Sequence, residues 1–158
     1  MKKKTGFLLL LFVAGVSTLT AQNYERAIGL RLGTMVGGSY KQFIHTAGAI
    51  EAILDLDIVH PSQMSVRGTF FYERHFPIIA VDGLEWYIGP GVTVGAKIGD
   101  NTDRLFLCGV DFVGGVEYKL ATLPLCFAFD FDPKLYFTGY SGIRIAPANV
   151  GFTMRYTF

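Results

Sequence analysis

The chain has few charged residues and, after residue 21, no long apolar run. Asp, Glu, Lys and Arg make up 17% of the 158 residues, against about 25% in ordinary soluble domains. No stretch after residue 21 approaches the ~20 apolar residues that a membrane-spanning helix requires. The basic residues form no stripe of the kind that binds nucleic acid, and we expect no nucleic-acid partner. The composition argues against a helical membrane protein, an ordinary soluble domain and a nucleic-acid-binding protein.

Apolar residues are nevertheless abundant, and they alternate with polar ones. The chain is 51% hydrophobic and 15% aromatic. Because successive side chains of a β-strand point to opposite faces, the last nine residues divide into two sets. The apolar set is Val150, Phe152, Met154, Tyr156 and Phe158, and the polar set is Gly151, Thr153, Arg155 and Thr157. An apolar face toward lipid and a polar face toward an interior is the pattern of an outer-membrane β-barrel.

The N-terminal segment is typical of a secretory signal peptide. The lysines at positions 2, 3 and 4 precede an apolar stretch over residues 6–16 and a small, polar stretch over residues 17–21. We expect cleavage after Ala21, so that residues 1–21 are the signal peptide and residues 22–158 form a single outer-membrane domain. That domain has 11 Lys and Arg (14 minus the three N-terminal lysines) against 13 Asp and Glu, a formal charge of −2.

Period-two alternation predicts eight strands, with connecting tips at 34–39, 59–63, 99–104 and 138–147. The strands are expected over residues 26–36, 38–44, 48–58, 64–75, 84–98, 105–120, 123–138 and 147–158. An even number of strands closes an up-and-down sheet with both chain ends on one side. The fold class predicted is all-β, an eight-stranded antiparallel transmembrane barrel. Pro90 cannot donate a ladder hydrogen bond, so a bulge or local distortion is expected there.

The same alternation points most charged residues into the barrel. The expected inward acids are Glu51, Asp55, Asp57, Glu73, Glu85, Asp111, Glu117, Asp130 and Asp132, and the expected inward bases are Arg31, Lys41, Arg67, Lys97, Lys119, Lys134 and Arg155. Only the segment 38–44 leaves open which face is apolar. An eight-stranded barrel is about filled by its own side chains, so nine acids against seven bases predict a plugged, ion-paired interior and no general porin.

Other chemistry has weaker support. Asp130 and Asp132 could form a metal or catalytic carboxylate pair, but an ion-pair network has the same sequence pattern and is the favoured interpretation. The three histidines lie at positions 45, 60 and 75, in a loop or near turns, which does not favour an active site. We expect no catalytic residue, cofactor or metal. Cys108 and Cys126 are predicted on opposite faces and at different heights, which excludes a disulfide.

Aromatic residues gather near the strand ends that are expected on the periplasmic side. These are Tyr72, Trp86, Tyr118, Tyr156 and Phe158. Such residues form a girdle at the membrane interface of outer-membrane barrels. Carbohydrate stacking is the less favoured alternative.

With its signal peptide, its eight alternating segments and its terminal Gly-Phe-Thr-Met-Arg-Tyr-Thr-Phe, the chain resembles the small eight-stranded outer-membrane barrels of Gram-negative bacteria, similar to OmpX and the OmpA transmembrane domain. The resemblance implies that the barrel-insertion machinery reads an assembly signal formed by Phe152, Met154, Tyr156 and Phe158. It also implies a monomer in contact with outer-membrane lipid, with a structural, envelope-stabilising or surface-interaction role. Two alternatives stay open: a lipid-modifying barrel enzyme of the lipid A deacylase or acyltransferase type, and a soluble, lipid-carrying periplasmic barrel.

Overall fold

The computed structural model describes residues 24–57, 63–99, 102–138, 142–146 and 149–158. The predicted signal peptide lies outside these residues. Ten strands occur in them: β1 (Arg26–Gly33), β2 (Val36–His45), β3 (Gly48–Asp57), β4 (Gln63–Pro77), β5 (Leu84–Gly99), β6 (Thr102–Lys119), β7 (Leu125–Phe131), β8 (Lys134–Thr138), β9 (Gly142–Ala146) and β10 (Val150–Thr157). Within the described ranges, no helix is long and apolar enough to cross a membrane.

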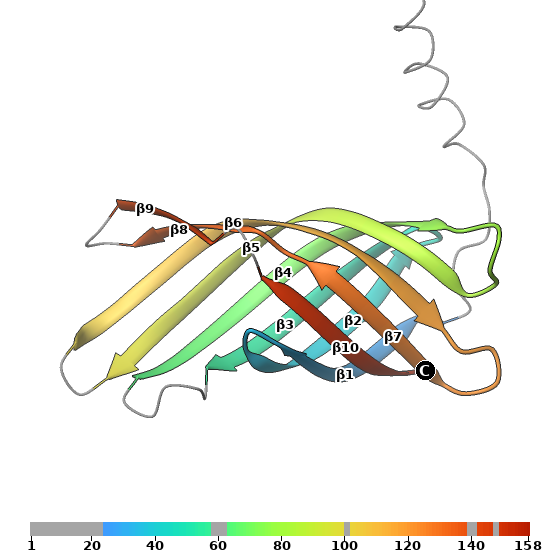
Figure 1. Cartoon of the computed structure of the whole chain (residues 1–158), viewed down its shortest axis with the longest axis horizontal. Coiled ribbons are helices and arrows are strands. Elements are labelled where there is room, and N and C mark those ends of the chain that lie inside the picture. Colours follow the sequence, from blue (N-terminus) through green and yellow to red (C-terminus); the bar gives the residue numbers. More distant parts are fainter. Residues whose placement is uncertain (1–23, 58–62, 100–101, 139–141, 147–148) are drawn as a thin grey trace, which may run out of the picture.

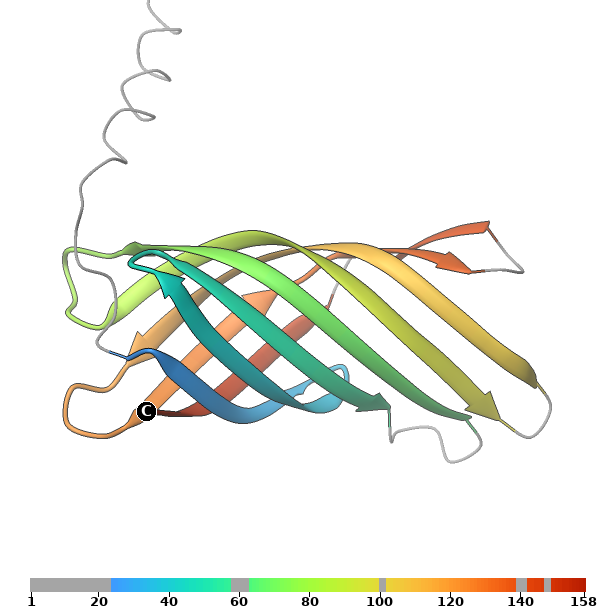
Figure 2. The same ribbon diagram turned by 180° about the vertical axis from the view of Figure 1, so that it is seen from behind.

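The strands close into an antiparallel barrel (Figures 1 and 2). Each strand from β1 to β6 pairs with the next strand along the chain. β7 then pairs with β10, and β10 pairs with β1, which closes the ring. The backbones of Arg26 and Phe158 exchange two hydrogen bonds of 3.0 and 2.8 Å, so the seam closes at the last residue. We call this end of the barrel the terminal end. The predicted fold class, an eight-stranded antiparallel barrel, is confirmed.

β7 and β8 are two parts of the single strand predicted over 123–138. Both pair with β6 in one register, because Gly114 faces Phe131 and Asp111, three residues earlier, faces Lys134, three residues later. Pro133 lies in the break between them and lacks a backbone N–H. The alternation of faces therefore continues through the break.

The predicted boundary between the tip at 138–147 and the last strand at 147–158 is wrong. Residues 142–146 form β9, which pairs with β8 as a hairpin. Ala146 pairs with Lys134, and Val150 pairs with Phe131. Between these two pairs, the chain advances four residues from β9 to β10 but only three from β7 to β8. One extra residue is therefore accommodated between β9 and β10, in a region partly outside the described residues.

One further expectation about the strands needs correction. β1 ends at Gly33 and β2 begins at Val36, so most of the tip expected over 34–39 is strand. At Pro90 the ladder to β4 lacks its bridges, which is the local distortion expected there, and the register is the same on either side, so no bulge forms. The register shifts instead between Phe43 and His45 and between Lys97 and Gly99.

The two faces of the wall differ as the alternation predicts. Along β10, exposed and buried residues alternate at every position, with the apolar set outside. In β2, the strand whose faces the sequence left open, Ser39 and Lys41 are buried and Tyr40 is exposed. All five residues of the predicted aromatic girdle are exposed on the outer face.

Candidate functional site in the barrel interior

A buried lysine occupies the centre of the charged interior. Lys41 projects inward from β2, and its Nζ lies 2.7 Å from Glu73 Oε2, 3.0 Å from Glu117 Oε2 and 3.4 Å from Glu51 Oε2. Glu51 faces Lys41 directly in the register of β2 and β3, whereas the other two acids come from β4 and β6. One ammonium group therefore compensates carboxylates from three other strands.

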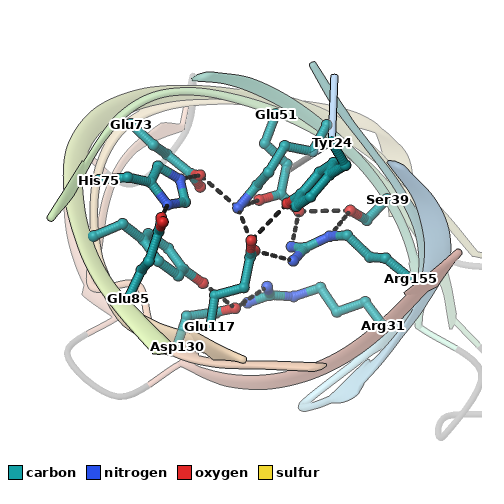
Figure 3. Close-up of polar contacts among 12 residues, drawn as sticks. Tyr24, Arg31, Ser39, Glu51, Glu73, His75, Glu85, Glu117, Asp130 and Arg155 are labelled. Atoms are coloured by element: carbon teal, nitrogen blue, oxygen red, sulfur yellow. Dashed lines mark hydrogen bonds and ion pairs between the residues drawn. The ribbon is translucent and has the colours of Figure 1, made fainter. Parts of the chain in front are cut away.

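Arg155 of β10 joins two of the same acids (Figure 3). Its Nη1 lies 2.9 Å from Glu117 Oε2, and its Nη2 is paired with Glu51 Oε1. Its Nε donates a 2.9 Å hydrogen bond to Ser39 Oγ, whose hydroxyl donates to Glu51 Oε1 at 2.5 Å. The planar guanidinium thus uses all its nitrogens in fixed directions, which orients the acids around it.

Tyr24 contacts this cluster from the residues that precede β1. Its buried hydroxyl donates a 2.5 Å hydrogen bond to Glu117 Oε1 (Figure 3). Burial raises the pKa of Tyr24 well above its usual value, and the neighbouring Glu117 raises it further, so the phenol remains a donor. No sequence pattern singled out Tyr24, because it lies outside every alternating segment.

His75 is enclosed in the interior, although the sequence analysis placed it only near a turn. Its Nδ1 lies 3.1 Å from Glu85 Oε2, and its Nε2 lies 3.3 Å from Glu73 Oε2. The imidazole also stacks on Tyr87, with ring centroids 5.0 Å apart. Its parity with Glu73 on β4 was the signal that could have placed it inside. His45 is exposed, and residue 60 lies outside the described residues.

A second group of ion pairs begins at Arg31. The guanidinium binds Asp130 with two nearly parallel bonds of 2.8 and 2.5 Å, and Asp132 Oδ1 lies 3.5 Å away. The Tyr87 hydroxyl adds a 3.3 Å hydrogen bond to Asp130. Lys134 then holds Asp132 at 3.0 Å. The two aspartates are thus the acids of an ion-pair network, the favoured interpretation of their sequence pattern.

Lys134 extends this second group toward β6. Its Nζ lies 3.4 Å from Asp111 Oδ2 and contacts the hydroxyls of Thr69 and Thr93 at 3.4 and 3.5 Å. Arg67 is only half-buried and donates a 2.6 Å hydrogen bond to the Tyr136 hydroxyl.

A small apolar cluster, which the sequence analysis missed, lies among these charges. It consists of Ile53, Phe71, Tyr87 and Val113. Lys41 Nζ lies 4.4 Å from the centre of the Tyr87 ring, and Lys134 Nζ lies 5.6 Å from that of Phe71. Aromatic faces attract cations, so the cluster contacts both charged groups favourably. Ile53, Phe71 and Val113 share the parity of their polar neighbours, but the sequence-based prediction assigned them to neither face.

The charge balance differs from the expected nine acids and seven bases. Among the described side chains, the eight buried acids are Glu51, Asp55, Glu73, Glu85, Asp111, Glu117, Asp130 and Asp132, and the four buried Lys or Arg are Arg31, Lys41, Lys134 and Arg155. Lys119 lies at the barrel end and donates to the backbone carbonyls of Leu120 and Leu123. The side chains of Asp57 and Lys97 lie outside the described ones.

Metal binding and disulfide formation find no support in the part of the chain that the structure describes. There, no group of three or more His, Cys, Asp and Glu is arranged to hold a metal ion. Cys108 is exposed and Cys126 is buried, and both thiols are free. The predicted assembly residues of β10 and the following Phe158 all lie on the outer face, with Phe158 58% exposed.

The comparisons with known proteins define the fold. No family model and no curated protein matches the chain. Among solved structures, the chain is similar to the N-terminal β-barrel domain of Pseudomonas aeruginosa OprF, with a TM-score of 0.57 and 16% sequence identity. The match covers 87% of this chain and 98% of that domain. This likeness assigns an outer-membrane-type eight-stranded barrel fold to the chain.

Proposed function

We propose that this chain is an integral outer-membrane β-barrel with a structural, envelope-stabilising or surface-interaction role, and that it does not conduct as a general porin does. The proposal rests on one observation: inside the apolar outer wall, single buried cations contact several acids at once. Lys41 of β2 and Arg155 of β10 together contact Glu51, Glu73 and Glu117, which come from three other strands. Side chains fixed in this way occupy the space through which ions would have to pass.

The outer face supports a membrane location. Large apolar side chains of β1, β3, β5, β6 and β10 are exposed there, and a soluble protein would not leave so large a connected apolar surface in water. In a bilayer, the closed ladder leaves no strand edge unpaired around the ring, which is what a barrel requires to cross. The similarity to the OprF barrel supports the same location through the fold.

The burial of His75 supports the non-enzymatic part of the proposal. His75 is buried among Glu73, Glu85 and Tyr87, so its imidazole does not face lipid. A lipid-modifying barrel needs its base and nucleophile within reach of a lipid substrate.

Single-barrel recordings in planar bilayers test the closed interior. The purified barrel is expected to give no steady large conductance, because the shared ion pairs fix the side chains inside it. A general porin measured in the same bilayer serves as the positive control for insertion and detection. Stable openings on the nanosiemens scale would contradict the proposal of a non-conducting interior.

A further inference from the structure

The outer face of the wall carries an apolar groove across β1 to β4. Its volume is about 640 Å³. Five large side chains form its walls: Ile28, Leu30, Tyr40, Leu54 and Phe70. Gly38, Ala52 and Gly68 form its floor. The groove is therefore a recess in the same surface that faces lipid in the proposed function.

The cross-strand register explains the recess. One row of paired residues runs Leu30, Gly38, Leu54, Gly68, and the next row runs Ile28, Tyr40, Ala52, Phe70. Each row thus places small residues beside large ones. Ala52, the small residue of the second row, lies next to Gly38 and Gly68 of the first. Because paired side chains on one face lie about 4.5–5.5 Å apart, the large residues stand as walls around a floor that is mostly backbone.

Packing within the chain does not require the floor glycines. A Cβ at Gly68 would meet no atom within 4 Å, and one at Gly38 would meet only the Gly29 oxygen, at 3.9 Å. By contrast, a Cβ at the neighbouring Gly37 would lie 2.4 Å from Leu54 O. Nothing in the barrel itself therefore fills the space above Gly38 and Gly68.

The groove becomes polar and basic where it approaches the terminal end of the barrel. The Tyr40 hydroxyl donates a 3.2 Å hydrogen bond to Gln42 Oε1. Gln42 pairs with Arg26, which is exposed two residues from Ile28 on the same outer face. Among the described contacts, no ion pair joins Arg26 to a carboxylate. An apolar recess with an exposed guanidinium at one end matches an acyl chain that carries an anionic phosphate.

We propose that this groove binds one phospholipid of the periplasmic leaflet, with an acyl chain on the glycine floor and the phosphate near Arg26. The inference rests on the proposed membrane location, in which the terminal end faces the periplasm. An unfilled recess in the hydrocarbon layer would lose dispersion contacts on its walls, and a flexible acyl chain restores them.

A second copy of the chain is the less suitable occupant. Two barrels in one membrane form a closed pair about an axis along the membrane normal. Their identical faces would then bring both Arg26 side chains to the same level near the contact. Like charges opposed in this way disfavour association, whereas a phosphate in the same place is attracted.

Native mass spectrometry of the refolded barrel in detergent tests this assignment. Wild type, mixed with dipalmitoyl phosphatidylglycerol or with lipid A, is expected to retain one phosphatidylglycerol and no lipid A. The G38L/G68L variant fills the recess and is expected to lose the bound lipid. The R26Q variant is expected to bind on the order of ten-fold more weakly, the effect of losing one charge-assisted hydrogen bond.

The matched control is G114L, since Gly114 lies on the outer face of β6 and a Cβ there meets nothing within 4 Å. This variant is expected to retain the lipid. Heat-dependent gel mobility checks that every variant folds. Lipid A retained in place of phosphatidylglycerol, a dimer that G38L/G68L abolishes, equal retention by G38L/G68L, or no retained lipid on wild type would each overturn the assignment. Loss of outer-membrane location would instead contradict the proposed function, which membrane fractionation reports separately.

Discussion

Single residues in the interior stabilise several partners at once. Lys41 contacts three carboxylates, and Arg155, Arg31 and Lys134 contact two each. Because acids outnumber Lys and Arg among the buried side chains, each cation offsets the desolvation of more than one acid. Removal of a cation should therefore cost more than removal of one of its acids.

At this scale, Lys41→Met is expected to lower the free energy of unfolding by about 3–5 kcal/mol, because it leaves buried carboxylates uncompensated. Urea unfolding of the barrel in detergent, followed by fluorescence of Trp86, the only tryptophan, measures the change. Adding Glu73→Gln is expected to recover part of the loss, since it removes one of the uncompensated acids.

Lys119→Met is the matched control, because Lys119 lies at the barrel end and donates only to turn carbonyls. Its effect is expected to stay within ~0.5 kcal/mol. If both lysine variants had the same stability, Lys41 would not have the central role that its contacts indicate.

At the scale of elements, β10 has two separate roles. Its inward residues, Thr153 and Arg155, belong to the interior, whereas its outward residues form the apolar face. The next residue, Phe158, completes the seam through backbone hydrogen bonds with Arg26, while its ring remains exposed. The ring therefore adds little to packing within the barrel.

Deletion of Phe158 is expected to reduce assembly in cells more than it reduces folded stability. The resemblance to small outer-membrane barrels implies that the insertion machinery reads the terminal aromatic, and we propose this role for Phe158. Even full burial of a Phe contributes only ~1.5–3 kcal/mol, and this ring is largely exposed. The comparison is between refolding of purified protein in detergent and the yield of barrel in the outer membrane.

Phe158→Tyr keeps both chain length and an aromatic ring, so it is expected to assemble normally. Equal losses in detergent and in cells on deletion would make Phe158 a packing residue. An unchanged yield in cells would remove its assembly role.

The break between β7 and β8 and the extra residue between β9 and β10 show what local sequence patterns can and cannot predict. Pro133 occupies an outward position, and the register does not change across the break between β7 and β8. The alternation from Leu123 to Phe137 is therefore continuous, and Pro133 is the one feature of that segment that could have indicated the break. The extra residue between β9 and β10 could not be predicted, because pairing with β7 and β8 determines it.

At the scale of the whole molecule, closure should make the barrel resistant to detergent. The unboiled protein is expected to migrate differently from the boiled protein in gels, because each strand of the closed ring, from β1 to β7 and β10, is paired on both sides. Fractionation is expected to recover the protein with the outer membrane. Recovery of the folded chain in the soluble periplasm would contradict this and favour the lipid-carrying periplasmic alternative.

Alternation, together with the signal-like N-terminal segment and the terminal aromatic residue, predicted the barrel class, and alternation alone predicted the face on which most residues lie. Arg31, Glu51, Asp130 and Arg155 are buried because each follows the parity of its own strand, a property that needs only neighbouring residues. Even so, only the charged residues were used to predict the interior, so Phe71 was not predicted to lie there although it has the same parity as Thr69 and Glu73.

The pairing of the charged residues could not be predicted from the sequence, because it depends on the tertiary structure. Lys41 and Glu117 are 76 residues apart, and Ser39 and Arg155 are 116 apart, yet both pairs are hydrogen-bonded. Closure of the sheet determines which strands oppose each other and at what height, and this depends on every register around the ring at once. The groove over Gly38 and Gly68 has the same origin, because two registers must agree before its small residues become adjacent.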